Sequence, residues 1–234
     1  MAKNLATRYT EAMKEHPYGY ALFRPALSTT LRPGSCGYID DNGRWNRILL
    51  DIQATTNEGF SASTSLSAMP TQYHTWGPKA SSGVVQRRVA FDGGADALAA
   101  GFPAEVKVAL NFSTTNEFGA ILHCQKVVTE SGFDYREPFK DWAKANAKAI
   151  LQHCRDVRDR EFCVVTSTFE TSEVDIHAWT GKDKTVSMGF KAGATGVGEI
   201  GPSGQFVKMG SASEWNHDSI DVRIQTILKQ KEIC

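Results

Sequence analysis

The residues whose types and spacing suggest binding chemistry are a tryptophan and the arginines around it. Arg44, Trp45 and Arg47 follow Asn42-Gly43, a pair typical of a tight type I′ turn because both positions need positive φ. Guanidinium groups bind phosphate in bidentate fashion, and an indole buries its ring while its N–H stays hydrated. The cluster indicates contact with lipid headgroups. The alternative is a tryptophan packed on its own sheet beside solvated arginines.

Residues that would carry catalysis or bind metal form no recognisable pattern. The six histidines match no metal-binding spacing, and the sequence holds no nucleophile elbow or phosphate-binding loop. Residues 196–201, GVGEIG, match a dinucleotide fingerprint in letters, but small residues precede them and Pro202 follows. We therefore expect no enzyme activity, no cofactor and no resident metal.

The composition favours a single cytosolic domain. The chain has 234 residues with 26 basic and 26 acidic side chains, so its net charge gives no sign of nucleic acid as a partner. The five cysteines are widely spaced and form no CxxC pair, and no secretory leader opens the sequence, which favours free thiols in a reducing compartment. No linker divides the chain, and we expect one domain over residues 1–234.

Two amphipathic helices are expected. Over residues 3–15 one side carries Leu5, Tyr9, Ala12 and Met13, the opposite side carries Lys3 and Lys14, and Arg8 lies near the acidic residues. Pro138 suits the first position of a second helix over residues 138–158. Its apolar stripe consists of Phe139, Ala143, Ile150, Cys154 and Val157.

The second helix also carries a cationic stripe. Its members lie within about 80° of one another on a helical wheel, and they are Lys140, Lys144, Lys148, Arg155 and Arg158. Like charges at this spacing repel one another in an isolated helix. The stripe indicates a surface for acidic lipid or for an acidic partner subunit; the alternative is a solvated face.

Alternating apolar residues predict two β-hairpins on either side of the long helix. The first joins residues 105–112, with Val106, Val108, Leu110 and Phe112 on one face, to residues 118–128. The second joins a strand containing Val174 and Ile176 to one containing Val186, Met188 and Phe190. The expected fold is α+β, with a twisted, mainly antiparallel sheet and packed helices.

This order of elements resembles the pore-forming domain of gasdermins, and more narrowly the fungal gasdermin-like regulators of cell death. The resemblance lies in LRPGSCGYIDDNGRWNRILLDI (31–52), in REFCVVTSTFETSEVDIHAWTGKDKTVSMGF (160–190) and in the Gly-rich stretch up to SASEWNHDS. It implies a cytoplasmic protein that binds acidic lipids, oligomerises, inserts β-hairpins into the plasma membrane and causes regulated cell death. A chain of 234 residues leaves room for the pore-forming domain without the C-terminal repressor domain of animal gasdermins. Restraint is then expected from another source, such as meeting a divergent allelic homologue.

The resemblance assigns roles to the residues found above. Lipid binding falls to Lys3, Arg8, Lys14, Arg44, Trp45 and Arg47, membrane insertion to the apolar faces of the two hairpins, and the oligomer interface to the cationic stripe. The alternative is a non-enzymatic β-rich interaction or carbohydrate-binding module, with stacking residues Trp45, Trp76, Trp179 and Trp215. A hydrolase without a recognisable motif is a third, weaker hypothesis.

Overall fold

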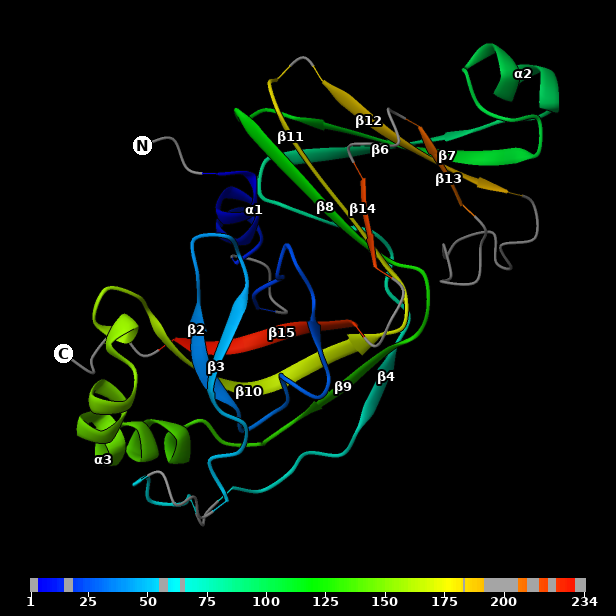
Figure 1. Cartoon of the computed structure of the whole chain (residues 1–234). Helices are drawn as coiled ribbons and strands as arrows, with labels where there is room; N and C mark the ends of the chain where they lie inside the picture. The colour runs from blue at the N-terminus through cyan, green and yellow to red at the C-terminus, as the bar shows by residue number, and fades with distance from the viewer. Residues whose placement is uncertain are drawn as a thin grey trace.

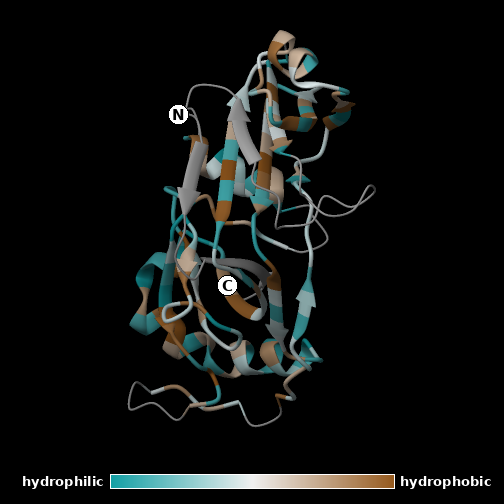
Figure 2. Ribbon diagram, turned by 90° about the vertical axis from the view of Figure 1, so that its right-hand side faces the viewer, coloured by the Kyte–Doolittle hydropathy of each residue, from teal (hydrophilic) through white to brown (hydrophobic). Residues whose placement is uncertain are grey.

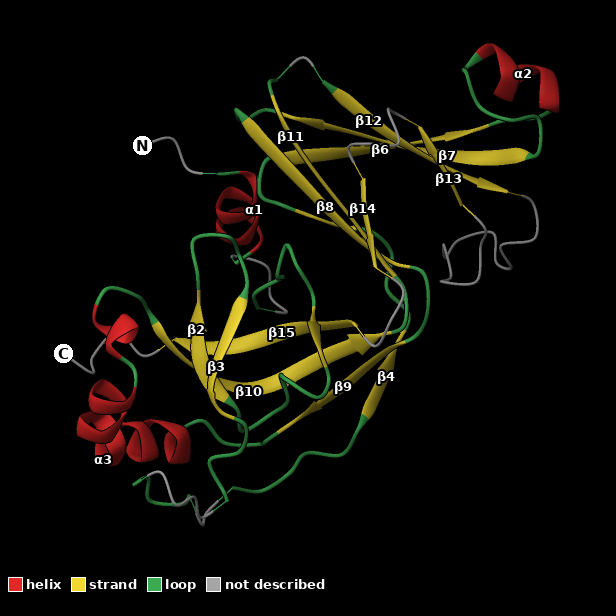
Figure 3. Cartoon of the chain, viewed as in Figure 1, coloured by secondary structure: helices red, strands yellow, loops and turns green. Residues whose placement is uncertain are grey.

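The computed structural model describes residues 4–14, 19–54, 59–63, 66–182, 184–191, 206–209, 215–218 and 222–229, with side chains described up to Lys191. Lys3 and most of the Gly-rich stretch lie outside these residues. Strands form three sheets, and helices lie at their margins (Figure 3). Every strand pair in the described part is antiparallel, so the α+β class holds, in a helix-poor form.

The lower part of the molecule in Figure 1 is a seven-stranded sheet, here called the base sheet. Its centre is β10 (Phe162–Thr171), which pairs along one edge with β15 (Val222–Lys229). The other edge of β10 forks, pairing first with β2 (Cys36–Ile39) and then with β9 (Val128–Gly132). The outer positions belong to β1 (Ala26–Leu27), β3 (Trp45–Leu49) and β4 (Gln72–His74).

Helix α3 (Glu137–His153) packs on the base sheet through the predicted stripe. Phe139, Ala143 and Ile150 are buried among Phe162 and Val164 of the sheet. The helix ends earlier than predicted because Cys154 leaves helical geometry, with φ −133° and ψ 102°. A separate 3-10 turn, η1 (Arg155–Arg158), follows, and it still buries Val157.

Two four-stranded sheets stack above the base sheet in Figure 1. The middle sheet contains β5 (Lys79–Ala80), β8 (Phe118–Cys124), β11 (Val174–Thr180) and β14 (Trp215–Asp218). The outer sheet contains β6 (Val84–Ala90), β7 (Val106–Thr114), β12 (Thr185–Lys191) and β13 (Phe206–Met209), with α2 (Gly94–Ala99) between β6 and β7. Figure 2 shows apolar and polar bands alternating along strands of this upper part.

The two predicted hairpins are wrong as pairings. Strand β7 pairs with β6 and β12, whereas β8 pairs with β5 and β11. The chain therefore crosses from the outer to the middle sheet after Thr114 and returns after Thr180. Within the two upper sheets, the consecutive strands that do pair are β6 with β7 and β12 with β13. Alternation identifies the apolar face of a strand but not the strand beside it.

The residues predicted to face lipid consequently lie in separate layers. Leu110 and Phe112 on β7 lie opposite Met188 and Val186 on β12, and the outer sheet turns these side chains, with Phe190, towards the middle sheet. Val108 lies opposite Phe190 and is half-buried. Val174 and Ile176 belong to the other face of the middle sheet, which packs on helix α1 (Leu5–Met13).

Val106 departs from the predicted face because of a β-bulge. Phe190 pairs with Val108, but the next residue, Lys191, pairs with Val106, so Lys107 is the extra residue on β7. The bulge turns Val106 to the α2 side of the outer sheet, where it packs with Phe102 and Ala109.

No helix within the described part of the chain is long and apolar enough to cross a membrane.

Ile150 tests the packing of α3 on the base sheet. It is fully buried, so Ile150→Ala is expected to lower the free energy of unfolding by about 2–5 kcal/mol. The matched control is Lys148→Ala on the exposed side of the same helix, expected to change it by less than about 0.5 kcal/mol. Urea denaturation measures both. Equal midpoints for the two variants would contradict the assignment of faces.

Candidate functional site

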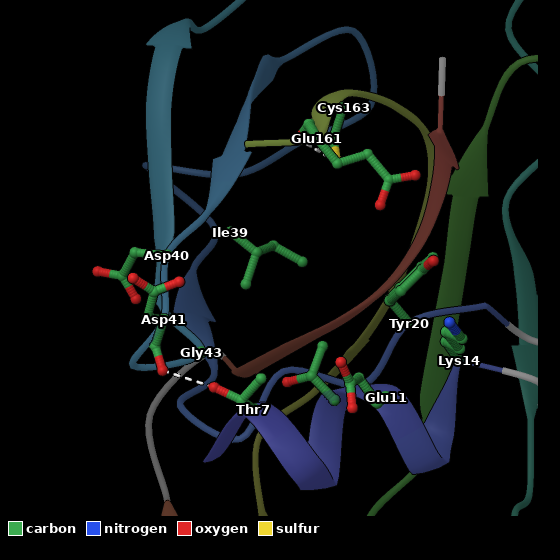
Figure 4. Close-up of a pocket in the computed structure, with 11 residues that line it drawn as sticks. Thr7, Glu11, Lys14, Tyr20, Ile39, Asp40, Asp41, Gly43, Glu161 and Cys163 are labelled. Carbon is green, nitrogen blue, oxygen red and sulfur yellow. Dashed lines mark hydrogen bonds between the residues drawn. The ribbon is translucent and has the colours of Figure 1, made fainter. Parts of the chain in front are cut away.

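Helix α1 is docked on the turn between β2 and β3 by its own capping residue. The Asn4 side-chain oxygen accepts the Thr7 N–H at 2.9 Å, and its amide donates to the Asp41 carbonyl oxygen at 2.6 Å. The Thr7 hydroxyl also contacts the Asp41 carbonyl oxygen at 2.6 Å (Figure 4). The cap thus fixes both the start of the helix and its position on the turn. Sequence reasoning missed this contact, although Asn before a helical pattern is a capping signal.

The turn itself differs from the predicted type I′ turn. The Gly43 N–H donates to the Asp40 carbonyl oxygen, and the Asp40 N–H donates to the Arg44 carbonyl oxygen. The loop between Asp40 and Arg44 therefore has three residues and ends at Gly43, with φ +69°. The Asp40 carboxylate selects this form by accepting the N–H groups of Asn42 and Arg44 at 2.9 Å. Partial burial works to raise the pKa of Asp40, but hydrogen bonds from Arg44, Asn46 and Asn42 outweigh it and hold the pKa below its usual range.

A cavity of about 590 Å³ lies between α1, this turn and the start of β10 (Figure 4). Its charged lining is mainly acidic, with Glu11, Asp40, Asp41 and Glu161 against the single described cation Lys14. Arg160 forms an ion pair with Asp41 at 3.0 Å, but the other carboxylates still make the cavity an unfavourable site for an anionic headgroup. The structure therefore does not place Lys14 in a basic patch with Arg44 and Arg47.

Arg8 is half-buried and contacts the middle sheet. Its guanidinium lies 4.5 Å from the centre of the ring of Phe118, which is the first residue of β8. The predicted apolar side of α1 is right at Tyr9 and Met13, which are buried, and wrong at Leu5, which is 44% exposed. Lys3 lies outside the described residues.

Trp45 and Arg47 line a second depression, of about 550 Å³, together with Tyr38 and His153. Arg44 and Arg47 are exposed, and neither forms an ion pair with a described carboxylate. Trp45 is half-buried with its indole nitrogen out of contact with solvent, so the ring packs on its own sheet and does not project from the turn. Tyr38 donates to Asp156 at 2.8 Å, and that hydrogen bond raises the pKa of Tyr38 to about 12.

The cationic stripe is divided by the end of α3. Lys144 and Lys148 are exposed on the helix, and Lys140 forms an ion pair with Glu137 at 3.1 Å. Arg155 and Arg158 belong to η1, beyond the extended residue Cys154. The predicted single stripe over residues 140–158 is therefore wrong, because helical spacing no longer relates its two parts.

Two of the four tryptophans predicted for carbohydrate stacking are core residues. Trp76 and Trp179 are each 4% exposed and contribute to hydrophobic cores. The side chain of Trp215 lies outside the described part. These positions count against the carbohydrate-binding alternative.

The described side chains hold no group of three or more metal-ligating residues. The four cysteines among them, Cys36, Cys124, Cys154 and Cys163, are free thiols. Burial raises the pKa of Cys36 to about 12, and it raises the pKa of Cys124 and Cys163 as well. Such thiols are poor nucleophiles.

Comparisons with known proteins give only weak structural similarity. No family model and no curated protein matches the chain. Among solved structures, a chain of the gasdermin A3 membrane pore, determined by cryo-electron microscopy, is similar over 97% of this chain and 90% of its own length. The identity is 11% and the TM-score 0.33, values that assign no family.

Substitution of Asn4 separates helix capping from docking. Asn4→Asp keeps the oxygen that caps α1 but removes the amide that donates to Asp41, whereas Asn4→Ala removes both. We expect faster amide hydrogen exchange in α1 for both variants, and a larger effect for Asn4→Ala, whose lost cap costs about 0.5–2 kcal/mol. Wild-type exchange in Asn4→Asp would show that the Asp41 contact does not hold the helix.

Proposed function

We propose that this chain is a gasdermin-like pore-forming protein that binds acidic lipids, oligomerises and inserts β-hairpins to permeabilise membranes. The observation that carries the proposal is the outer sheet. It consists of two sequence-local hairpins, β6–β7 and β12–β13, joined by pairing of β7 with β12. On β7 and β12 one face of this unit is apolar and is buried by packing against the middle sheet, whereas on β6 the same face carries the exposed side chains of Gln86 and Arg88.

Such a unit suits two environments. A strand with one apolar face packs on a protein core in water and faces hydrocarbon in a bilayer without changing its sequence. The ladder between β6, β7, β12 and β13 satisfies its backbone groups in both, provided that further copies complete the two free edges. Only the contact with the middle sheet must be given up.

The proposal revises the inserting residues. Leu110, Phe112, Val186, Met188 and Phe190 share the buried face of the outer sheet, and Val108 lies in register with them. Val174 and Ile176 stay with the middle sheet under this hypothesis. Strand β7 has 9 residues, which matches the roughly 9–11 of a spanning strand. Strands β6 and β12 have 7 each, so insertion requires that adjoining residues extend them.

The biological setting is proposed from the sequence resemblance. The chain would remain in the cytoplasm until activation and then act at the plasma membrane in regulated cell death of the fungal allorecognition type, also called heterokaryon incompatibility. A divergent allelic homologue would be the activating partner. Dye release from liposomes with and without acidic lipid, with this protein alone and mixed with such a homologue, tests the proposal. Absence of release under all four conditions would refute it.

Arg44 and Arg47 are the predicted contacts with acidic lipid. A cationic side chain near an anionic surface contributes about 1 kcal/mol, so Arg44→Gln with Arg47→Gln should weaken liposome binding about 30-fold. Lys14→Gln is the matched control, since Lys14 faces the acidic cavity and should have little effect. Co-sedimentation measures all three proteins, and high salt should mimic the double variant. Equal loss in the control would contradict the assignment.

Lys144 and Lys148 are the predicted contacts with a neighbouring subunit. Both are exposed, so Lys144→Glu with Lys148→Glu should change the stability of the monomer by less than about 0.5 kcal/mol. Complementary charge chiefly sets partner choice and encounter rate, and the double variant should not form oligomers on liposomes. Arg155→Glu with Arg158→Glu, on the separate η1 turn, is the control. Wild-type assembly by the lysine variant would leave this face as solvated surface.

A further inference from the structure

Strand β6 is an exposed edge of unusual extent. Every residue from Val85 to Ala90 is exposed, although β6 pairs with β7 over its whole length. Val85 and Val89 are 43% and 38% exposed. A long, unpaired edge with exposed β-branched side chains is a template for another strand.

The hydrogen-bond pattern identifies which backbone groups the edge offers. The Phe91 N–H donates to the Lys107 carbonyl oxygen, and the Thr115 N–H to the Gly83 carbonyl oxygen. These bonds flank the pairs Ala90–Val108 and Val84–Thr114, which are therefore the non-hydrogen-bonded kind. By alternation, the N–H and C=O groups of Gln86 and Arg88 point away from β7, and those of Val85, Arg87 and Val89 point towards it.

The side chains of the edge have a definite pattern. Val85, Arg87 and Val89 share the face that α2 partly covers, because Val89 lies opposite Ala109, a member of the core under α2. A strand added to the edge would place one residue opposite each of these three as a non-hydrogen-bonded pair, the closer of the two kinds. Cross-strand pairs of opposite charge and of β-branched residues stabilise a sheet.

The charge of the edge is not neutralised within the described part of the molecule. Neither Arg87 nor Arg88 forms an ion pair with a described acidic side chain. A second copy of β6 is a poor partner. The antiparallel register that pairs all seven residues places Arg87 opposite Arg87 of the copy, and like charges directly opposite one another are destabilising.

We propose that the free edge of β6 binds an extended acidic segment of another protein by strand addition. The segment contributes a carboxylate opposite Arg87 and apolar side chains two residues to either side, opposite Val85 and Val89. Its backbone pairs with Gln86 and Arg88. The inference concerns the chain before any assembly on a membrane, when the β6 edge is not paired with another copy, and it does not depend on membrane activity.

A synthetic peptide tests the proposal directly. The probe is Thr-Val-Thr-Glu-Thr-Val-Thr with blocked ends, and the control peptide carries Lys in place of Glu. Binding of the Glu peptide should slow the exchange of the Gln86 and Arg88 amide hydrogens with solvent, which NMR measures during a titration. Arg87→Glu should weaken binding of the Glu peptide about tenfold, equivalent to 1.4 kcal/mol, and should strengthen binding of the Lys peptide. Arg158→Glu, at an exposed arginine on η1, should change neither.

A proline at a residue whose N–H points away from β7 tests the contribution of backbone pairing to peptide binding separately from that of charge. Gln86→Pro removes an edge donor without removing a bond to β7, so it should weaken peptide binding while the other described strands keep their wild-type exchange. If that variant fails to fold, the charge exchange at Arg87 still decides the matter. Three outcomes overturn the proposal: no amide protection at about 1 mM peptide, equal binding of the Glu and Lys peptides, or self-association without peptide that Gln86→Pro abolishes.

Discussion

The architecture depends on one constraint, that the middle sheet is buried on both faces, one of which also carries His123, Asp175 and His177. Ile121 and Trp179 project from one face, and Leu122 and Ile176 project from the other. Both faces must be covered, since exposing the apolar side chains on either one would cost roughly 25 cal/mol per Å² of apolar surface. The outer sheet covers the first face, and α1 with Trp76 covers the second. The position of α1 and the stacking of the sheets are therefore consequences of the same requirement.

The constraint also explains why strands that are adjacent in sequence do not pair. If β7 and β8 formed a hairpin, they would share one sheet, and the apolar face that β7 contributes would need another cover. Crossing between layers after Thr114 and Thr180 lets the same segments bury one another face to face. Within the middle sheet, the indole of Trp179 lies over its cross-strand partner Gly119, where a Cβ atom would overlap the ring. A glycine is required there for space, not for positive φ.

Charge is balanced over the whole chain but segregated on the surface. The charged residues that line the cavity beside α1 are mainly acidic, while Arg44 and Arg47 beside the β2–β3 turn and Arg87 and Arg88 on the outer sheet form no ion pair with a described carboxylate. The net charge of zero is therefore the sum of separate acidic and basic surfaces. The acidic cavity lies at the docked helix, and the basic edge lies on the outer sheet, so surfaces of opposite charge occupy different parts of the molecule.

The sequence alone determined features that depend on local periodicity. The buried stripe of α3, the antiparallel character of the strands and the apolar side of β7 and β12 follow from spacings of 3.6 and 2 residues, because every residue in such a pattern reports the same face. The tertiary structure decided everything that required knowing a distant neighbour. It decided that β7 pairs with β12, that a bulge turns Val106 to α2, that Asp40 replaces a two-residue turn with a longer one, and that the cationic stripe breaks at Cys154. It also decided that Trp76 and Trp179 are core residues. These outcomes come from satisfying burial and hydrogen bonding over the whole chain at once, and no short window of sequence contains that information.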